Sequence, residues 1–110
     1  MYINPPYSQL LAWVRHGVGQ LVSHRGHLNQ LWLVPARTDT RAGQLLLGAA
    51  QSVCFIKGRL KFIEPDTDLP SGNSAPFPSM LVYAGNDRQA ARFDEHFRSL
   101  GTVMDNFLNV

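Results

Sequence analysis

MYINPPYS, residues 1–8, decides the fold, because two adjacent prolines end a short apolar strand. Each proline fixes its own φ angle and lacks an N–H group, and the residue before each is pushed towards extended geometry. The strand Met1–Ile3 should therefore end in a stiff, open turn whose carbonyls have no local donor. Asn4 adds an amide oxygen there and Tyr7 adds an aromatic face, which suits a planar amine held by two oxygens under a ring. The alternative is a simple strand end, with Ser8 as the N-cap of a helix.

Length and composition indicate one small domain spanning residues 1–110. The chain is 45% apolar and 16% charged, which is ordinary for a globular protein. No apolar run approaches the roughly 20 residues of a membrane span, and no secretory leader is recognisable. The single cysteine, Cys54, cannot form an internal disulfide and is expected as a small buried hydrophobe, so we expect a cytoplasmic protein. The net charge of +2 is too small to indicate a nucleic-acid partner by itself.

Hydrophobic periodicity predicts an alternation of strands and helices, hence an α/β fold. In the first half of the chain we expect a strand at 1–3, a helix from Ser8 to Leu21, a strand at 30–34 and a helix at 41–50 that is capped within 38–40. A strand at 52–62, bent at Gly58, should follow, and then a long loop at 64–79. The remainder should form a strand at 80–84, a turn at 85–87, a helix that ends at Leu100 with Gly101 as its stop, and a short docking helix within 102–110. Ligands of open α/β sheets bind beyond the carboxyl ends of the strands. The loops 4–8 and 35–39 both follow strands, so we expect them to converge on one site.

Four segments, in this order and spacing, resemble the phage-type DNA N6-adenine methyltransferases. They are residues 4–8, 33–40, 55–62 and 75–79, the last directly before the strand at 80–83, so the likeness covers about residues 3–84. The first segment alone would also fit methyltransferases of RNA amines or of protein glutamine, and the later segments favour DNA adenine. The resemblance implies a doubly wound methyltransferase sheet, S-adenosylmethionine as methyl donor and double-stranded DNA as substrate.

The resemblance also implies roles for the catalytic residues Asn4, Pro5, Pro6 and Tyr7. The target adenine would be swung out of the duplex. The Asn4 amide oxygen and the Pro5 carbonyl would accept hydrogen bonds from its 6-amino group, which draws the nitrogen lone pair out of conjugation. Tyr7 would stack on the base. Transfer would be a direct displacement, with most of the rate coming from positioning and oriented dipoles.

The chain departs from the family where the donor should bind. Three residues precede Asn4, and no glycine turn or acidic residue for the donor stands upstream. The segment Gly17–Leu21 lacks a third glycine and lies within a predicted helix, so it is no nucleotide loop. We therefore expect a partial sheet without the donor-binding strands, belonging to a truncated or incomplete enzyme. Tyr2 and Ile3 would form an open sheet edge, which recruits other chains or a missing segment and favours self-association.

Five polar residues are further candidates for substrate binding. Arg37 and Asp39 would position the base or the donor; alternatively, Asp39 caps the next helix and Arg37 pairs with a carboxylate. Lys57, Arg59 and Lys61 share one parity of the strand predicted at 52–62, so they would line one face and contact DNA phosphates. The alternative is a solvated strand face with edge-protecting lysines.

Other conspicuous residues suggest structure rather than chemistry. His24 and His27 lack the further ligands that a metal site needs, and we expect none there. Trp13 and Trp32 are expected in the core. Cys54 has no neighbour that would activate a thiol.

Two classes of function remain open from the sequence. One is a DNA adenine N6-methyltransferase that is complete only with a donor-binding segment. The other is a non-catalytic remnant or nucleic-acid-binding module that keeps the base pocket alone. An enzyme that methylates amines of RNA or protein is a third possibility.

Overall fold

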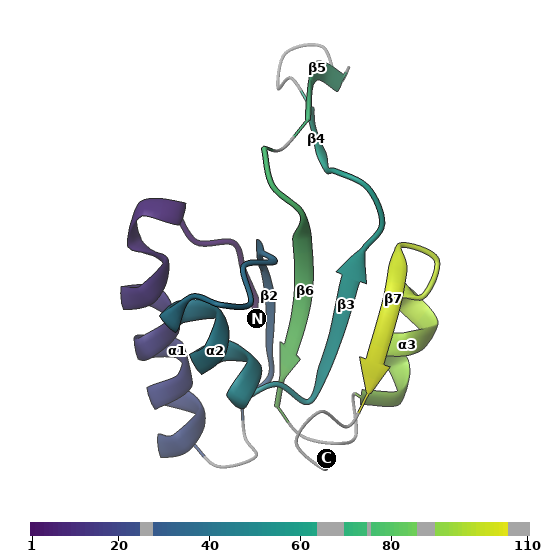
Figure 1. Ribbon diagram of the computed structural model, residues 1–110. Helices are drawn as coiled ribbons and strands as arrows, with labels where there is room; N and C mark the ends of the chain where they lie inside the picture. Colours follow the sequence, from purple (N-terminus) through teal and green to yellow (C-terminus); the bar gives the residue numbers. More distant parts are fainter. Residues whose placement is uncertain (25–27, 64–69, 75, 86–89, 106–110) are drawn as a thin grey trace.

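The computed structural model describes residues 1–24, 28–63, 70–74, 76–85 and 90–105. Its elements are β1 (Tyr2–Ile3), the 3₁₀ helix η1 (Tyr7–Gln9), α1 (Leu10–Ser23), β2 (Gln30–Pro35), α2 (Arg41–Gly48), β3 (Ser52–Ile56), β4 (Lys61–Ile63), β5 (Pro70–Ser74), β6 (Ser79–Ala84), α3 (Ala90–Phe97) and β7 (Gly101–Asp105). Figure 1 shows α1 and α2 side by side at one end of the main sheet, and α3 beside β7 at the other.

The main sheet has five strands in the order β1-β2-β6-β3-β7, and β4 and β5 form a separate hairpin. β1 pairs in parallel with β2, whereas β6 runs antiparallel to both β2 and β3. The strands β1, β2 and β3 therefore point the same way, with β6 inserted between two of them. β7 pairs antiparallel with β3 at the far edge. The predicted α/β class is confirmed as a mixed α/β fold with a mixed sheet.

One face of this sheet is covered by α1 and α2. The cluster beneath them consists of buried apolar side chains from both helices and four strands: Ile3, Val14, Trp32, Val34, Ala42, Leu46, Ala50, Val53, Met80 and Val82. Trp32 is fully buried, as expected, and its indole Nε1 donates to Gln30 Oε1 at 3.0 Å. The Gln30 amide in turn donates to the Gly17 carbonyl of α1 at 3.0 Å. This chain of hydrogen bonds lets polar groups sit under a helix without unpaired donors.

The opposite face is covered by α3. Because side chains alternate along a strand, Leu81 and Tyr83 face α3 while Met80 and Val82 face the other helices. Cys54 is buried among them, as expected, and its Sγ lies 3.5 Å from the Phe97 carbonyl. Burial raises the pKa of this thiol, which agrees with a structural rather than a reactive cysteine.

The segment predicted as one strand over 52–62 is two strands. β3 ends at Ile56, and Gly58 follows with φ +75°, a left-handed conformation that glycine adopts without steric cost. β4 begins at Lys61 and pairs with β5, which lies in the segment predicted as a loop. The glycine at the expected bend is confirmed, but it redirects the chain into a hairpin. In Figure 1 this hairpin projects beyond the sheet edge at which β3 ends and β6 begins.

Three smaller expectations are wrong. The described start of the tail is strand β7 (Gly101–Asp105) where a docking helix was expected within 102–110. Gly101 does not stop α3 by adopting a left-handed conformation; it starts β7, where a Cβ would overlap the backbone of Phe55 on β3. Trp13 is 45% exposed on α1 and does not belong to the core. Residues 64–69, 75, 86–89 and 106–110, with His27, lie outside the described residues.

Candidate active site

The proline corner follows β1, where the sequence predicts a turn. Pro5 is buried, while Asn4 and Pro6 are exposed, and Pro6 is extended with φ −64° and ψ 136°. The Pro6 carbonyl accepts a hydrogen bond from the Gln9 N–H at 3.1 Å, so one of the two carbonyls expected to lack a local donor has one. Among the described residues, no donor reaches the Pro5 carbonyl or the Asn4 side chain. Neither of the two oxygens proposed for the amine contact is therefore engaged by another described residue, and Asn4 is the exposed one of the pair.

Tyr7 begins η1 and is 51% exposed, so its ring is open to a ligand. The Tyr7 and Phe77 rings meet edge to face, with centroids 4.7 Å apart and planes at 89°. Phe77 is 7% exposed and also carries Arg37 on one face, with Cζ 5.4 Å from the ring centroid. Edge-to-face aromatic pairs and stacked guanidinium groups are both favourable arrangements. Phe77 thus joins the first predicted loop to the second.

Backbone pairing explains why the loop after β1, the loop after β2 and the segment before β6 meet. β2 ends where β6 begins, with Pro35 opposite Ser79, and the Ala36 N–H donates to the Pro78 carbonyl at 2.8 Å. β1 ends at the same edge because it is parallel to β2. The loops after β1 and β2 and the segment before β6 are therefore neighbours. Their convergence at the carboxyl ends of β1 and β2 is as predicted.

A hollow of about 440 Å³ opens between these loops and the start of α2. Aromatic rings, prolines, aliphatic side chains and two arginines line it: Tyr7, Ser8, Leu10, Leu11, Pro35, Arg37, Thr40, Arg41, Ala42, Pro76 and Phe77. This size is typical of a small-molecule site, and the mainly apolar walls suit a flat ring. Of the four predicted catalytic residues, only Tyr7 lines the hollow, and Asn4, Pro5 and Pro6 lie outside its lining.

The start of α2 fixes the backbone of Arg37. Thr40 is the N-cap: its Oγ1 accepts from the Gly43 N–H at 3.1 Å and donates to the Arg37 carbonyl at 2.8 Å. The Gln44 amide also donates to the Thr38 carbonyl. Capping within residues 38–40 is thus confirmed, but Asp39 is exposed and does not supply the cap. Ser8 likewise caps no helix, since η1 and α1 have Pro6 and Gln9 at their N-cap positions.

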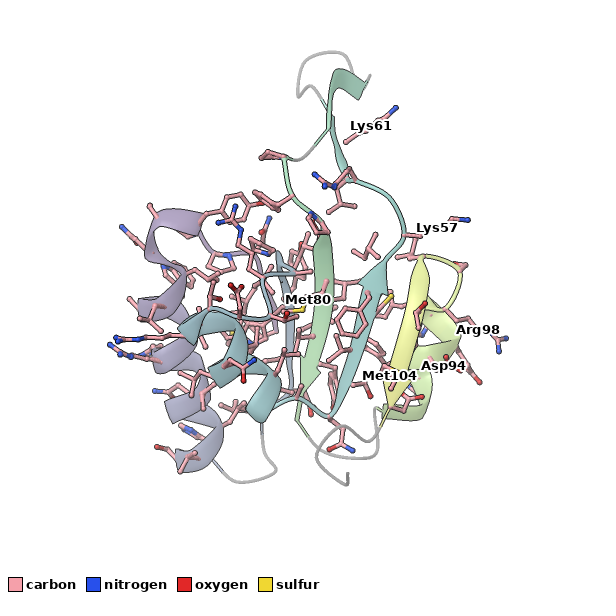
Figure 2. The ribbon with its side chains drawn as sticks, viewed as in Figure 1. Lys57, Lys61, Met80, Asp94, Arg98 and Met104 are labelled. Carbon is pink, nitrogen blue, oxygen red and sulfur yellow. The ribbon has the colours of Figure 1, made fainter. Side chains whose placement is uncertain are left out.

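The three predicted cations do not share a strand face. Lys57 follows β3, and its N–H donates to the Leu100 carbonyl at 2.8 Å. Arg59 lies beyond Gly58, and Lys61 begins β4. All three are exposed along the link from the sheet to the hairpin, and Figure 2 shows Lys57 and Lys61 extending outward on the same side in that view. The prediction that the three cations line one continuous strand face is therefore wrong. They lie one after another along the link between β3 and the hairpin.

Sequence reasoning missed Phe77, which connects Tyr7 with Arg37. The sequence signals were its place in the family-like segment 75–79 and an aromatic residue between Pro76 and Pro78, directly before a buried strand, but these signals assign no role to it. Prolines on either side restrict the backbone and so fix the direction of the ring. A contact between residues so far apart in the sequence follows from strand order, which composition does not reveal.

The fold is that of a mixed α/β protein, and proteins with open α/β sheets bind ligands beyond the carboxyl ends of their strands, where this hollow lies. The chain belongs to the DNA N-6-adenine-methyltransferase (Dam) family, whose family model matches residues 1–104. The resemblance found over residues 3–84 is thereby confirmed and extended. No curated protein and no solved structure matches the chain.

Family membership defines the activity at family level. It indicates methylation of adenine in DNA, and methyltransferases of this kind generally use S-adenosylmethionine. In the described part of the chain, no helix is long and apolar enough to cross a membrane.

Proposed function

We propose that the proline corner and the adjoining hollow form the acceptor-adenine site of a DNA adenine N6-methyltransferase. The observation that supports this most is the contact of Tyr7 and Arg37 with Phe77 at one wall of a base-sized hollow, at the carboxyl ends of β1 and β2. These residues come from three of the four family-like segments. Their convergence gives a target base swung out of DNA a place to enter.

The amine contact is assigned to two oxygens of the corner. The Pro5 carbonyl is fixed by two prolines, and the Asn4 amide is exposed beside it. Together they would accept both hydrogens of an adenine 6-amino group. Fixed acceptors act without reorganising during the reaction, which is the largest advantage that a preorganised site offers. Tyr7 would stack on the base with its exposed ring.

Phe77 is assigned a positioning role. Its edge contact sets the angle of the Tyr7 ring, and its face holds the Arg37 guanidinium at the mouth of the hollow. Arg37 then faces either the polar edge of the base or a neighbouring phosphate. Asp39 lies in the same loop but outside the lining, so it is proposed only as a contact to substrate groups beyond the hollow.

The hollow fits a base better than it fits the methyl donor. S-adenosylmethionine carries an ammonium group and a ribose diol, for which carboxylates are natural partners. Among the described residues, no Asp or Glu lines this hollow, and two arginines do. We therefore expect calorimetry of this chain with S-adenosylmethionine to show weak binding or none. Micromolar binding would show that the donor site lies within this chain.

DNA would lie along the edge that bears the site. Lys57, Arg59 and Lys61 would contact phosphates there, because all three are exposed beyond the end of β3. A second partner is proposed at the lateral edge of the sheet that β1 forms. Among the described residues, β1 pairs only with β2, so its outer edge is open to a further strand, either from a donor-binding segment or from another copy.

The test of function is methyl transfer from labelled S-adenosylmethionine to duplex DNA, RNA and protein acceptors in an extract of cells that express the chain together with a donor-binding segment. We expect N6-methyladenine in DNA, its loss with Asn4→Ala, and its retention with Ser8→Ala as a control at the same corner. Unchanged transfer with Asn4→Ala would eliminate the amine contact. Methylation of RNA or protein alone would favour the wider amine methyltransferase function.

A nucleic-acid-binding module is the second candidate function. It is favoured by one observation, the absence of acidic residues from the described lining of the hollow. Adenine-dependent binding of DNA without any methyl transfer in the extract would support this candidate.

A further inference from the structure

We propose that a second hollow, on the face of the sheet opposite α1 and α2, binds a nucleotide, that is, a flat base joined to a phosphate. This hollow measures about 430 Å³ and lies between β1, β2, β6 and α3. The residues that matter in it are Tyr2, Leu31, Tyr83, Arg92, Phe93 and His96. None of them lines the hollow at the proline corner. The inference is therefore independent of the proposed adenine site.

The floor of this second hollow is apolar and firmly packed. Tyr83 and Phe93 are almost completely buried, with ring centroids 6.3 Å apart. The Tyr83 hydroxyl donates to Asn29 Oδ1 at 2.9 Å, which fixes the phenol. Leu31 packs against the same cluster from β2. Such a floor is preformed and offers a dry surface to one side of a ligand.

One wall of the second hollow is an exposed aromatic ring. Tyr2 is 58% exposed on β1, at the edge of the sheet. Its neighbour Ile3 packs under α1, so by strand alternation Tyr2 faces the side of α3. An exposed tyrosine beside an apolar floor is a platform on which a nucleobase can stack, since every base has a π face.

The other wall is cationic. Arg92 and His96 stand four residues apart on α3, so they share one face of the helix. Both are exposed and both line the hollow, whereas no Asp or Glu lines it among the described residues. The guanidinium fork matches two phosphate oxygens, and the imidazole can donate to a third. Asp94 and Arg98 lie on the outer side of α3 in Figure 2, away from the sheet.

A phosphate beside a stacked ring is the chemistry shared by a free mononucleotide and by one unit of a DNA strand. The ligand class follows from combining the two walls, because a cationic wall alone would accept any anion. An aromatic floor alone would accept any flat apolar molecule. A nucleotide is the ligand that uses both.

The experiment is equilibrium dialysis of the full chain against labelled AMP, with adenosine, inorganic phosphate and a short single-stranded deoxyoligonucleotide as competitors. We expect saturable AMP binding that is tighter than that of adenosine or phosphate. Arg92→Gln should weaken it by roughly tenfold or more, because a hydrogen bond to a charged group is removed. Tyr2→Ala should also weaken it. Arg98→Gln, which lies just beyond the last residue of α3 and on its outer side in Figure 2, should leave it unchanged.

The oligonucleotide identifies the source of the nucleotide. Competition with AMP that depends on Arg92 indicates a unit of a DNA strand, and its absence indicates a free nucleotide. The proposal is overturned if neither AMP nor the oligonucleotide binds saturably at millimolar concentration, or if Arg92→Gln and Tyr2→Ala leave binding unchanged. AMP carries the 6-amino group that the proposed adenine site would also bind, so binding that Arg92→Gln and Tyr2→Ala remove belongs to the second hollow, and any part that only Asn4→Ala removes belongs to the proline corner.

Discussion

Gly17 shows how one residue sets the distance between α1 and the sheet. A Cβ at this position would overlap the six-membered ring of Trp32, which is fully buried and has no room to move. The same glycine offers its carbonyl to the Gln30 amide. Its place in a helix therefore reflects close packing and not flexibility.

Gly17→Ala should lower the free energy of unfolding by about 1–3 kcal/mol, the usual cost of overpacking. Gly19→Ala is the matched control, because it lies in the same helix with no atom within 4 Å of its added Cβ. That change should instead stabilise the protein by about 0.5–1 kcal/mol through helix propensity. Urea denaturation measures both. Equal effects at the two glycines would contradict the packing of Trp32 on α1.

Tyr7 and Phe77 should be coupled energetically, because their rings meet edge to face. A double-mutant cycle with Tyr7→Leu and Phe77→Leu should give a coupling energy of about 0.5–1.5 kcal/mol in thermal or chemical unfolding. The same cycle with Trp13→Leu in place of Tyr7→Leu serves as a control, because Trp13 lines no hollow that contains Phe77. Additive effects of Tyr7→Leu and Phe77→Leu would contradict the contact that joins the two loops.

At the scale of the elements, the strength of the local sequence signal decided which helices and strands could be predicted. The buried run at 30–34 and the capped helix at 41–48 have strong local signals and were predicted nearly to their ends. β5 and β7 have weak signals, since PSGNS and GTVMD contain turn-forming or mixed residues. Each is a strand because a partner lies beside it, β4 in one case and β3 in the other. Pairing over a distance is not encoded in local periodicity.

β1 should promote association of the chain, because an edge of a sheet offers unpaired backbone groups. We expect sedimentation to show concentration-dependent self-association and Tyr2→Lys to reduce it, since a charge on an edge strand discourages pairing. Val22→Lys is the control, because it replaces an exposed apolar residue of α1 that is not on an edge. A monomer at every concentration with a sharp, cooperative melt would count against an open edge at β1.

At the scale of the whole molecule, strand order brings the site together. The order β1-β2-β6 places the loop after β1, the loop after β2 and the segment before β6 at one edge. The sequence predicted the first two loops because each follows an evident strand. It could not predict that Phe77 lies at the site, because the position of Phe77 depends on β6 being inserted antiparallel beside β2. The cations after β3 were predicted as a group but with the wrong geometry, because Gly58 ends the alternation on which that geometry depended.

Binding of duplex DNA should depend on salt through the cations beyond β3. Arg59→Glu should weaken binding and flatten the slope of log affinity against log salt, by roughly 0.9 for each phosphate that the protein no longer neutralises. Arg15→Glu on α1 is the matched control, since Arg15 is exposed, lines neither of the two hollows described above, and should leave the slope unchanged. An unchanged slope for Arg59→Glu would remove it from the DNA-binding surface.

The most direct measurement of the central claim compares 2′-deoxyadenosine with purine 2′-deoxyriboside, which lacks the 6-amino group, by NMR titration of resonances from Tyr7, Phe77 and Arg37. The chain should bind deoxyadenosine about tenfold more tightly, because the Asn4 and Pro5 oxygens accept the amine hydrogens. Asn4→Ala should reduce this preference, while Tyr7→Ala should weaken both ligands. Equal affinity for the two nucleosides, or shifts confined to other residues, would contradict an adenine site at the proline corner.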